Sequence, residues 1–161
     1  MKKLRTAILT VSDGCFHGQR DDLSGQALAE EAESLGWVVK ERQTVPDEPG
    51  QIGEVIRSWA GRDDLDLLLS TGGTGLGPRD VTPEAVQPLL DRTAAGLAEL
   101  MRAEGLKKTP FAALSRSLAG TLNGKVVLCL PGSPKGALES LQAVQKLLPH
   151  AVDLAQGRTG H

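Results

Sequence analysis

A glycine-rich segment is the first feature of the sequence that could do chemistry. Residues 67–85 read LLLSTGGTGLGPRDVTPEA, so Gly72, Gly73, Thr74 and Gly75 follow an apolar run directly. Because glycine has no Cβ, a phosphate group could approach these backbone N–H groups closely. The segment matches neither the P-loop pattern nor the dinucleotide-binding fingerprint. A tight turn between a strand and a helix remains an alternative interpretation of the same glycines.

Two aspartates, Asp47 and Asp80, lie in loop segments that follow apolar runs. Asp47 lies in the PDEPG segment after a Val-rich run, and Asp80 ends the glycine-rich segment next to Arg79. An unpaired carboxylate would repel a phosphate, whereas a divalent cation between the two would remove that conflict, and Mg²⁺ prefers oxygen ligands. The alternatives are a turn-forming role for Asp47 and a turn or an ion pair with Arg79 for Asp80.

Two further loops could contribute to the same site. Ser12 and Asp13 follow the first apolar run, and the PGSPKG segment at 131–136 follows the last one. A helix that starts behind Ser133 would direct its N-terminal N–H groups at a second anionic group. Proline and glycine also shape ordinary turns, so this segment alone does not establish a binding site.

The elements between these loops alternate between strand and helix patterns, which is typical of an α/β fold. We expect a single domain over residues 1–161 with a mostly parallel open sheet, and a frayed tail over the C-terminal GRTGH. Thr82 is the expected N-cap of a helix that begins with Pro83. The expected strands are 6–12, 37–45, 65–71 and a hairpin of 117–122 with 125–130 around Asn123-Gly124, and the expected helices are 24–35, 51–60, 94–102 and one long amphipathic helix through Leu138, Leu141, Val144 and Leu148.

In an open parallel sheet, the loops that follow the strands lie along one edge, and ligands bind there. The segments at 12–13, 46–47, 72–80 and 131–136 each follow an expected strand. We therefore expect their side chains to converge in space.

Composition narrows the classes of partner. The 161 residues carry a formal net charge of −2, and only 2% of them are aromatic, which argues against a nucleic-acid surface. No apolar stretch approaches the ~20 residues that span a bilayer, so we expect no membrane association. Cys15 and Cys129 lack C-x-x-C spacing and the three histidines are scattered, which indicates a cytoplasmic protein without a zinc site.

The motifs taken in order resemble one known family. TVSDG, DDLSG, VPDE, STGGTGLGPRDVTPEA, LSR and LPGSPKG together resemble the molybdopterin-binding MogA/MoaB family of molybdenum cofactor biosynthesis. The resemblance covers essentially the whole chain. Its specificity comes from the order of the GGTG…DVTPE block and the PG-x-P block, because the isolated pieces occur widely.

The resemblance implies a three-layer α/β/α domain that assembles as a homotrimer or homohexamer and binds molybdopterin. In the active branch of the family, the domain transfers AMP from Mg-ATP to the terminal phosphate of the pterin and releases pyrophosphate. Carried onto this chain, it implies nucleotide-phosphate contacts from Gly72, Gly73, Thr74 and Gly75, with Asp47 and Asp80 as the catalytic and metal-binding acids. It implies a phosphate or pterin subsite at Gly132, Ser133 and Lys135, with Ser12, Asp13, Ser24 and Ser115 as further candidates.

Two other classes of function are compatible with the same resemblance. The first is a carrier that binds molybdopterin without catalysis, and the second is a structural assembly protein, with other molybdenum-cofactor proteins as partners in either case. The chain is short like the MoaB branch, but its PRDVTPEA segment is similar to the MogA branch. The presence of both Asp47 and Asp80 favours the enzyme, because a passive carrier would not need two metal-binding acids.

Overall fold

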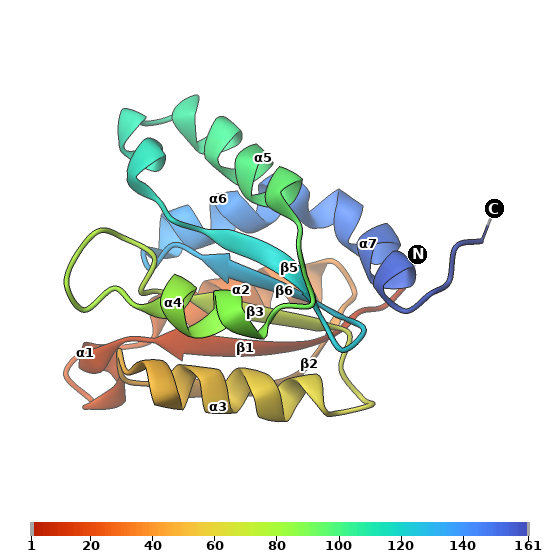
Figure 1. The fold of residues 1–161 in the computed structure, drawn as a ribbon. Helices are drawn as coiled ribbons and strands as arrows, with labels where there is room; N and C mark the ends of the chain where they lie inside the picture. Colours follow the sequence, from red (N-terminus) through yellow and green to blue (C-terminus); the bar gives the residue numbers. More distant parts are fainter. Residues whose placement is uncertain (1, 161) are drawn as a thin grey trace.

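A six-stranded sheet with helices on both faces forms the centre of the computed structural model, which describes residues 2–160 (Figure 1). The strand order is β2-β1-β3-β6-β5-β4, and β2, β1, β3 and β6 run parallel. The strand β5 runs antiparallel to both of its neighbours. The expected three-layer α/β/α fold is therefore confirmed.

The helices and strands have the following bounds. In chain order they are β1 Arg5–Val11, α1 Asp13–Phe16, α2 Leu23–Ser34, β2 Val38–Val45, α3 Pro49–Ala60, β3 Leu67–Thr71, α4 Thr82–Val86, β4 Arg92–Thr93, α5 Ala95–Leu106, β5 Leu118–Leu122, β6 Lys125–Leu130, α6 Pro134–Val144 and α7 Leu148–Ala155, with 3₁₀ turns η1 Gln87–Leu89, η2 Pro110–Leu114 and η3 Gln145–Leu147.

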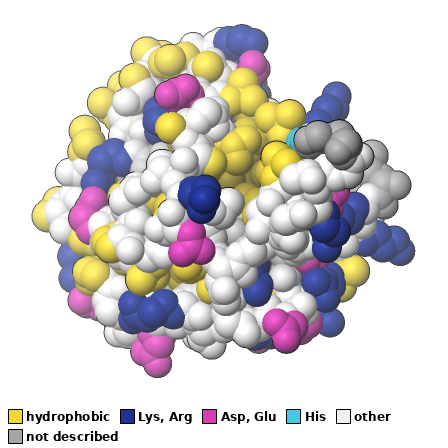
Figure 2. Space-filling view, turned by 45° about the vertical axis from the view of Figure 1, so that its right-hand side comes forward, with side chains coloured by type: hydrophobic (Ala, Val, Ile, Leu, Met, Phe, Trp, Pro, Cys, Tyr) yellow, Lys and Arg dark blue, Asp and Glu magenta, His cyan; other side chains and the backbone are white. Residues whose placement is uncertain are grey.

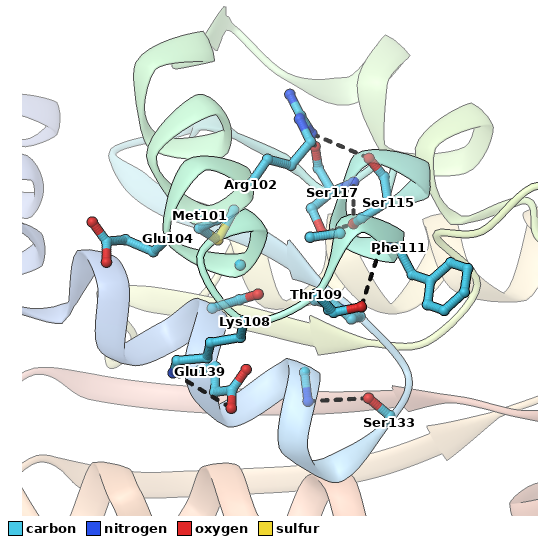
Figure 3. A pocket seen from close by; sticks show the side chains of 15 residues that line it. Met101, Arg102, Glu104, Lys108, Thr109, Phe111, Ser115, Ser117, Ser133 and Glu139 are labelled. Atoms are coloured by element: carbon cyan, nitrogen blue, oxygen red, sulfur yellow. Dashed lines mark hydrogen bonds and ion pairs between the residues drawn. The ribbon is translucent and has the colours of Figure 1, made fainter.

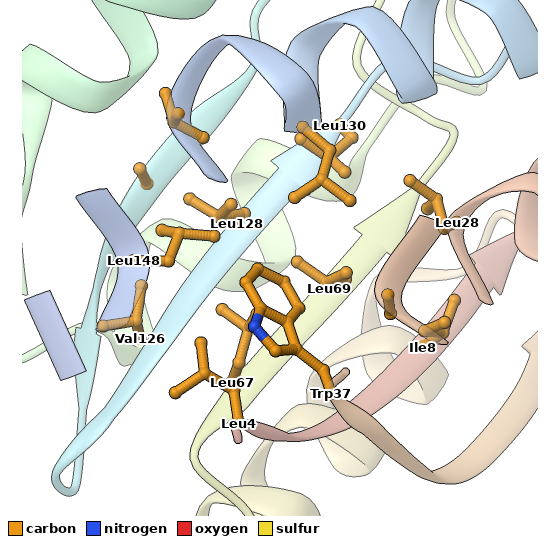
Figure 4. Packing of buried hydrophobic residues seen from close by; sticks show 14 of the residues in the cluster. Leu4, Ile8, Leu28, Trp37, Leu67, Leu69, Val126, Leu128, Leu130 and Leu148 are labelled. Carbon is orange, nitrogen blue, oxygen red and sulfur yellow. The ribbon is translucent and has the colours of Figure 1, made fainter. Parts of the chain in front are cut away.

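The core has two halves because successive residues of a buried strand point to opposite faces of the sheet. Ile8, Leu67 and Leu69 pack under α2, α5, α6 and α7, together with Trp37, which directly precedes β2 (Figure 4). Leu68, one residue along β3, packs on the other face under α3 and α4. This burial on both faces fixes the register of β3, so it also fixes where the glycine-rich segment begins.

The expected hairpin is present. Asn123 and Gly124 both have positive φ, 51° and 79°, as a type I′ turn requires, and they join β5 to β6. The antiparallel pair leaves β6 parallel to β3. The segment after β6 consequently lies at the same sheet edge as the segments after β1, β2 and β3.

Some expectations about the helices were wrong. The helix α4 starts at Thr82 with Val81 as its N-cap residue, and the Thr82 hydroxyl donates to the Gly72 carbonyl at 2.8 Å, so it is not the expected cap. The single long helix is interrupted at η3, because Pro149 has no N–H for the Gln145 carbonyl and instead occupies the first turn of α7. The short elements α1 and β4 were not expected at all.

Two further observations concern partners and the tail. Figure 2 shows Lys and Arg side chains interspersed with acidic ones on the face in view. Among residues 2–160, no helix has the length and apolar character needed to cross a membrane. Of the expected frayed tail, His161 lies outside the described residues, and Arg158 donates to Asp153 of α7 at 2.9 Å.

Candidate functional site

The loops that follow the four parallel strands meet at one edge of the sheet. Asp13, after β1, and Asp47, after β2, bind each other's backbone. A Cβ built on Gly73 would lie 3.4 Å from Asp47 Oδ1, and one built on Gly132 would lie 3.3 Å from the Gly72 Cα atom. These contacts bring together the segments that the sequence predicted to converge.

The glycine-rich segment has a backbone that only glycine tolerates well. Gly72 and Gly73 have φ of 104° and 71°, and a Cβ on Gly72 would collide with the Val11 carbonyl oxygen. The Thr82 amide donates to the Gly73 carbonyl at 3.0 Å, which fixes the end of the turn. Thr74, in the middle of the segment, is buried.

Several backbone N–H groups of this segment lack an acceptor in the protein. Within residues 2–160, none is found for the amides of Gly73, Thr74, Gly75 and Leu76. Consecutive unpaired N–H groups attract an anion, since their partial positive charges add. The segment therefore has the donors that a phosphate group requires.

The acids at this edge form an electrostatically unfavourable group. Asp47 is partly buried, and this burial raises its pKa above the ordinary value for a carboxyl group, with further contributions from the charges of Asp13 and Asp80. Arg79 donates to both carboxylate oxygens of Asp13, at 3.1 and 3.0 Å, and lowers the pKa of that group. It also pairs with Glu48 at 3.1 Å, whereas no ion pair with Asp80 is found among the described residues. Asp47 and Asp80 thus remain without a cationic partner in the described chain.

Asp80 is held inside the glycine-rich segment. Its Oδ2 atom accepts a hydrogen bond from the Gly77 amide at 2.9 Å, and Cβ atoms built on Gly75 and Gly77 would lie 2.8 and 2.9 Å from the same oxygen. The glycines therefore make room for the carboxylate as well as for a ligand. In the described part of the chain, no cluster of three or more His, Cys, Asp or Glu residues could hold a metal ion, so the protein offers at most two acids to one cation.

A cavity of about 230 Å³ opens between α5, η2 and α6 (Figure 3). Ser115 lies in its wall beside Ser117, with the two hydroxyl oxygens 2.8 Å apart, and Phe111, a residue that is 75% exposed, borders it. Ser133 lines the cavity from the other side and accepts from the Gly136 amide at 3.0 Å as the N-cap of α6. The cavity thus combines an apolar wall with several hydroxyl groups.

A smaller cavity of about 150 Å³ lies on the other side of the 131–136 segment. Ser12, Ser24 and Gly132 are among its lining residues, and the Ser24 hydroxyl donates to the Gly132 carbonyl at 2.5 Å. Lys135 is exposed on the first turn of α6 and lines neither cavity. The structure therefore brings Lys135 neither to a cavity nor to the acids, and Gly72 and Thr74 of the glycine-rich segment likewise line neither cavity.

Sequence reasoning missed three residues at this edge. Arg79 was considered only as a partner of Asp80, although it pairs with Asp13 and Glu48. Arg116 was quoted within the LSR motif, but its contacts with Gly75 and Glu84 had no signal in the sequence. Phe111 is one of two phenylalanines in the chain, and this rarity was its only signal in the sequence.

Comparison with known proteins places the chain in a molybdopterin-binding family. The model of the family described as "Probable molybdopterin binding domain" matches residues 7–150. The chain is 36% identical to a molybdopterin adenylyltransferase of Helicobacter pylori strain J99, over 98% of this chain and 90% of that protein. It is 40% identical to the molybdenum cofactor synthesis protein cinnamon of Drosophila melanogaster, over 96% of this chain but only 26% of that protein.

Solved structures show the same likeness. The crystal structure of the molybdopterin biosynthesis enzyme MoaB of Thermus thermophilus superposes with a TM-score of 0.90 at 55% identity, covering 96% of this chain and 97% of that one. Some curated relatives are much longer, so the chain spans about a quarter of cinnamon and half of a bifunctional protein of Chlorobaculum tepidum.

Proposed function

The chain belongs to the molybdopterin-binding family of molybdenum cofactor biosynthesis, and from this premise we propose that it is a molybdopterin adenylyltransferase. It binds molybdopterin and ATP and transfers AMP to the terminal phosphate of the pterin. The observation that supports this function best is the meeting of four amides, from Gly73 to Leu76, with two acids, Asp47 and Asp80, where residues 2–160 supply neither an acceptor for the amides nor an ion-pair partner for the acids. A site for the pterin alone would not need both features.

The reaction exchanges one phosphoanhydride bond for another. An oxygen of the pterin's terminal phosphate attacks the α-phosphorus of ATP, the bond from that phosphorus to the bridging oxygen breaks, and pyrophosphate leaves with the electron pair. No covalent intermediate on the protein is needed, because such reactions depend on positioning and on neutralisation of charge. The protein's task is to hold two polyanions in line.

The residues present fit a magnesium ion that arrives with ATP. Asp47 and Asp80 offer carboxylate oxygens, the ligands that Mg²⁺ prefers. Burial, and then the charges of Asp13 and Asp80, raise the pKa of Asp47, and a bound cation would offset both effects. When bound, Mg²⁺ neutralises the negative charge that develops on the phosphates. The amides of the glycine-rich segment donate to phosphate oxygens, and Asp80 is kept in place by the Gly77 amide.

Each cavity receives one part of the substrates in this proposal. The cavity of about 230 Å³ takes the pterin, which stacks its rings near Phe111 and reaches the hydroxyl groups of Ser115 and Ser133. The cavity beside Ser12, Ser24 and Gly132 takes part of the nucleotide. Lys135 would attract the phosphates from solvent by its charge.

The protein would act in the cytoplasm as a homotrimer or homohexamer and could pass its product to other molybdenum-cofactor proteins.

One assay tests this proposal. Purified protein is incubated with molybdopterin, ATP and Mg²⁺, and the products are separated and identified by mass. We expect adenylylated molybdopterin and pyrophosphate in equal amounts, with none when Mg²⁺ is chelated. Tight molybdopterin binding without any product would favour the carrier instead.

A further inference from the structure

Arg116 is bound entirely by protein groups at the back of the glycine-rich segment. Its amide donates to the Thr74 carbonyl at 2.7 Å, its Nε to the Gly75 carbonyl at 2.8 Å, and its Nη2 to the Asp80 carbonyl at 2.7 Å. Glu84, on α4, accepts from Nη1 at 2.7 Å and from Nη2 at 3.1 Å. Every nitrogen of the guanidinium thus donates to a protein group, and these bonds use four of its five N–H groups.

These contacts determine the direction of the unpaired amides. In a trans peptide unit, the C=O and the N–H point in opposite directions. Because the carbonyls of Thr74 and Gly75 point at Arg116, the N–H groups of Gly75 and Leu76 point away from it. Those two N–H groups are among the ones that lack an acceptor in the described chain.

The same side chain also joins the two ends of the loop. Gly75 and Asp80 are five positions apart, and one guanidinium binds the carbonyl oxygen of each. Asp80 is thereby held with its carboxylate beside the glycines. A Lys ammonium could not reproduce this arrangement, because it is a point charge without the planar fork of Arg.

We infer that Arg116, oriented by Glu84, is a positioning residue that holds the amides of Gly75 and Leu76 and the Asp80 carboxylate in the arrangement that receives the nucleotide phosphates. This inference rests on the proposed function and adds residues that touch no substrate. Glu84 neutralises the charge of Arg116, so the contribution is geometric rather than an attraction to phosphate.

The test compares Arg116→Lys and Glu84→Gln with the wild type and with Arg158→Lys. Arg158→Lys is the control, because it keeps the positive charge as Arg116→Lys does, at a side chain that pairs with Asp153 on α7. For each protein, binding of Mg-ATP is measured by calorimetry, steady-state kinetics give kcat and the KM for molybdopterin, and thermal unfolding gives the folded fraction.

For Arg116→Lys we expect Mg-ATP affinity to fall about tenfold and kcat to fall on the order of 10- to 100-fold per folded molecule, since small misplacements of reacting groups cost that much. The KM for molybdopterin should stay within about twofold, because Arg116 does not line the cavity that we assign to the pterin. Glu84→Gln should change the same quantities in the same direction but less, and Arg158→Lys should change none of them.

Two outcomes would overturn the inference. The first is an Arg116→Lys protein with wild-type kcat and Mg-ATP affinity, and the second is a loss of activity only in proportion to the loss of folded protein. Failure of the proposed function is distinguishable from both. If the wild type makes no product but binds Mg-ATP, and Arg116→Lys weakens that binding, then the positioning role stands and the transferase does not.

Discussion

Asp13 and Asp47 are bound to each other through their backbones in both directions. The Asp13 amide donates to Asp47 Oδ2 at 2.9 Å, and the Asp47 amide donates to Asp13 Oδ1 at 3.0 Å. This exchange ties the end of β1 to the end of β2 but leaves two carboxylates side by side. Arg79 forms ion pairs with Asp13 and Glu48 but none with Asp47 among residues 2–160, and Asp47 is the carboxyl whose pKa is raised, chiefly by burial.

Replacing Asp47 with Asn should therefore stabilise the ligand-free protein near neutral pH. The amide oxygen of Asn can still accept from the Asp13 N–H, while the repulsion and the burial of a charge are removed. We expect a gain of about 0.5–2 kcal/mol in the free energy of unfolding, the range of a successful charge substitution. Urea denaturation at about pH 7 measures it.

The stability that Asp47→Asn gains over the wild type should be smaller at acidic pH than at neutral pH. The pKa of Asp47 is raised in the folded protein, so folding is favoured while this carboxyl is protonated, and that stability is lost as the pH rises through the folded pKa. At about pH 4, close to the ordinary pKa of Asp, the difference between Asp47→Asn and the wild type should shrink. A variant that is less stable at both pH values would show that the ionised carboxylate is a net stabiliser of the turn.

Gly73→Ala should damage both the fold and the site. Gly73 has a φ of 71°, and an added Cβ would meet the Thr82 hydroxyl and lie 3.4 Å from Asp47 Oδ1. We expect a loss of about 1–3 kcal/mol in the free energy of unfolding from the strained backbone, together with weaker Mg-ATP binding. Gly96→Ala is the matched control, because a Cβ there has open space on α5 and should stabilise the helix by about 0.5–1 kcal/mol. Equal stabilities of the two variants would contradict this account.

The sequence predicted most of the sheet well, because continuous apolar runs and turn residues mark its long strands. The continuous apolar run before Gly72 became β3, buried at every residue, and Asn123-Gly124 became the hairpin turn. The two residues of β4 are exposed and have no periodicity, so no local pattern marks them. Thr82 had the residue type of an N-cap, but its hydroxyl found the Gly72 carbonyl, a contact that depends on the path of the whole loop.

The site shows the same limit. Four segments could be assigned to one sheet edge, since the topology of a parallel sheet requires it. The partners of Arg79 and Arg116 could not, because Asp13 is 66 positions from Arg79 and Gly75 is 41 from Arg116. The partners of a long side chain depend on which groups the fold brings near it, and the spacing of residues in the sequence does not predict this.

A homotrimer or homohexamer is expected from the family resemblance, and exposed apolar side chains agree with it. Phe111, Leu76 and Leu114 are each more than half exposed, and Figure 2 shows hydrophobic side chains gathered on the face in view. Light scattering at micromolar concentration should give three or six times the chain mass of 17.0 kDa. A mass of 17.0 kDa would contradict the prediction.

Asp80→Asn should separate catalysis from binding. The amide oxygen of Asn can still accept from the Gly77 N–H, so the loop should keep its shape while it loses the charge that would hold Mg²⁺. We expect kcat for adenylyl transfer to fall by about 100-fold or more, the usual cost of losing one electrostatic contact to a transition state. Molybdopterin affinity should remain near the wild-type value, because the cavity between α5, η2 and α6 is unchanged.

The control for Asp80→Asn is Asp63→Asn, which removes the same charge from an exposed turn before β3. Steady-state turnover and a molybdopterin binding titration, both on the same preparations, decide the outcome. If Asp80→Asn turns over like Asp63→Asn, then Asp80 is only a turn residue, and the glycines beside it would make room for a structural carboxylate rather than for a metal-bound phosphate. If instead molybdopterin affinity falls together with turnover, the glycine-rich segment and the pterin cavity form one site, and the assignment of the two substrates to separate cavities is wrong.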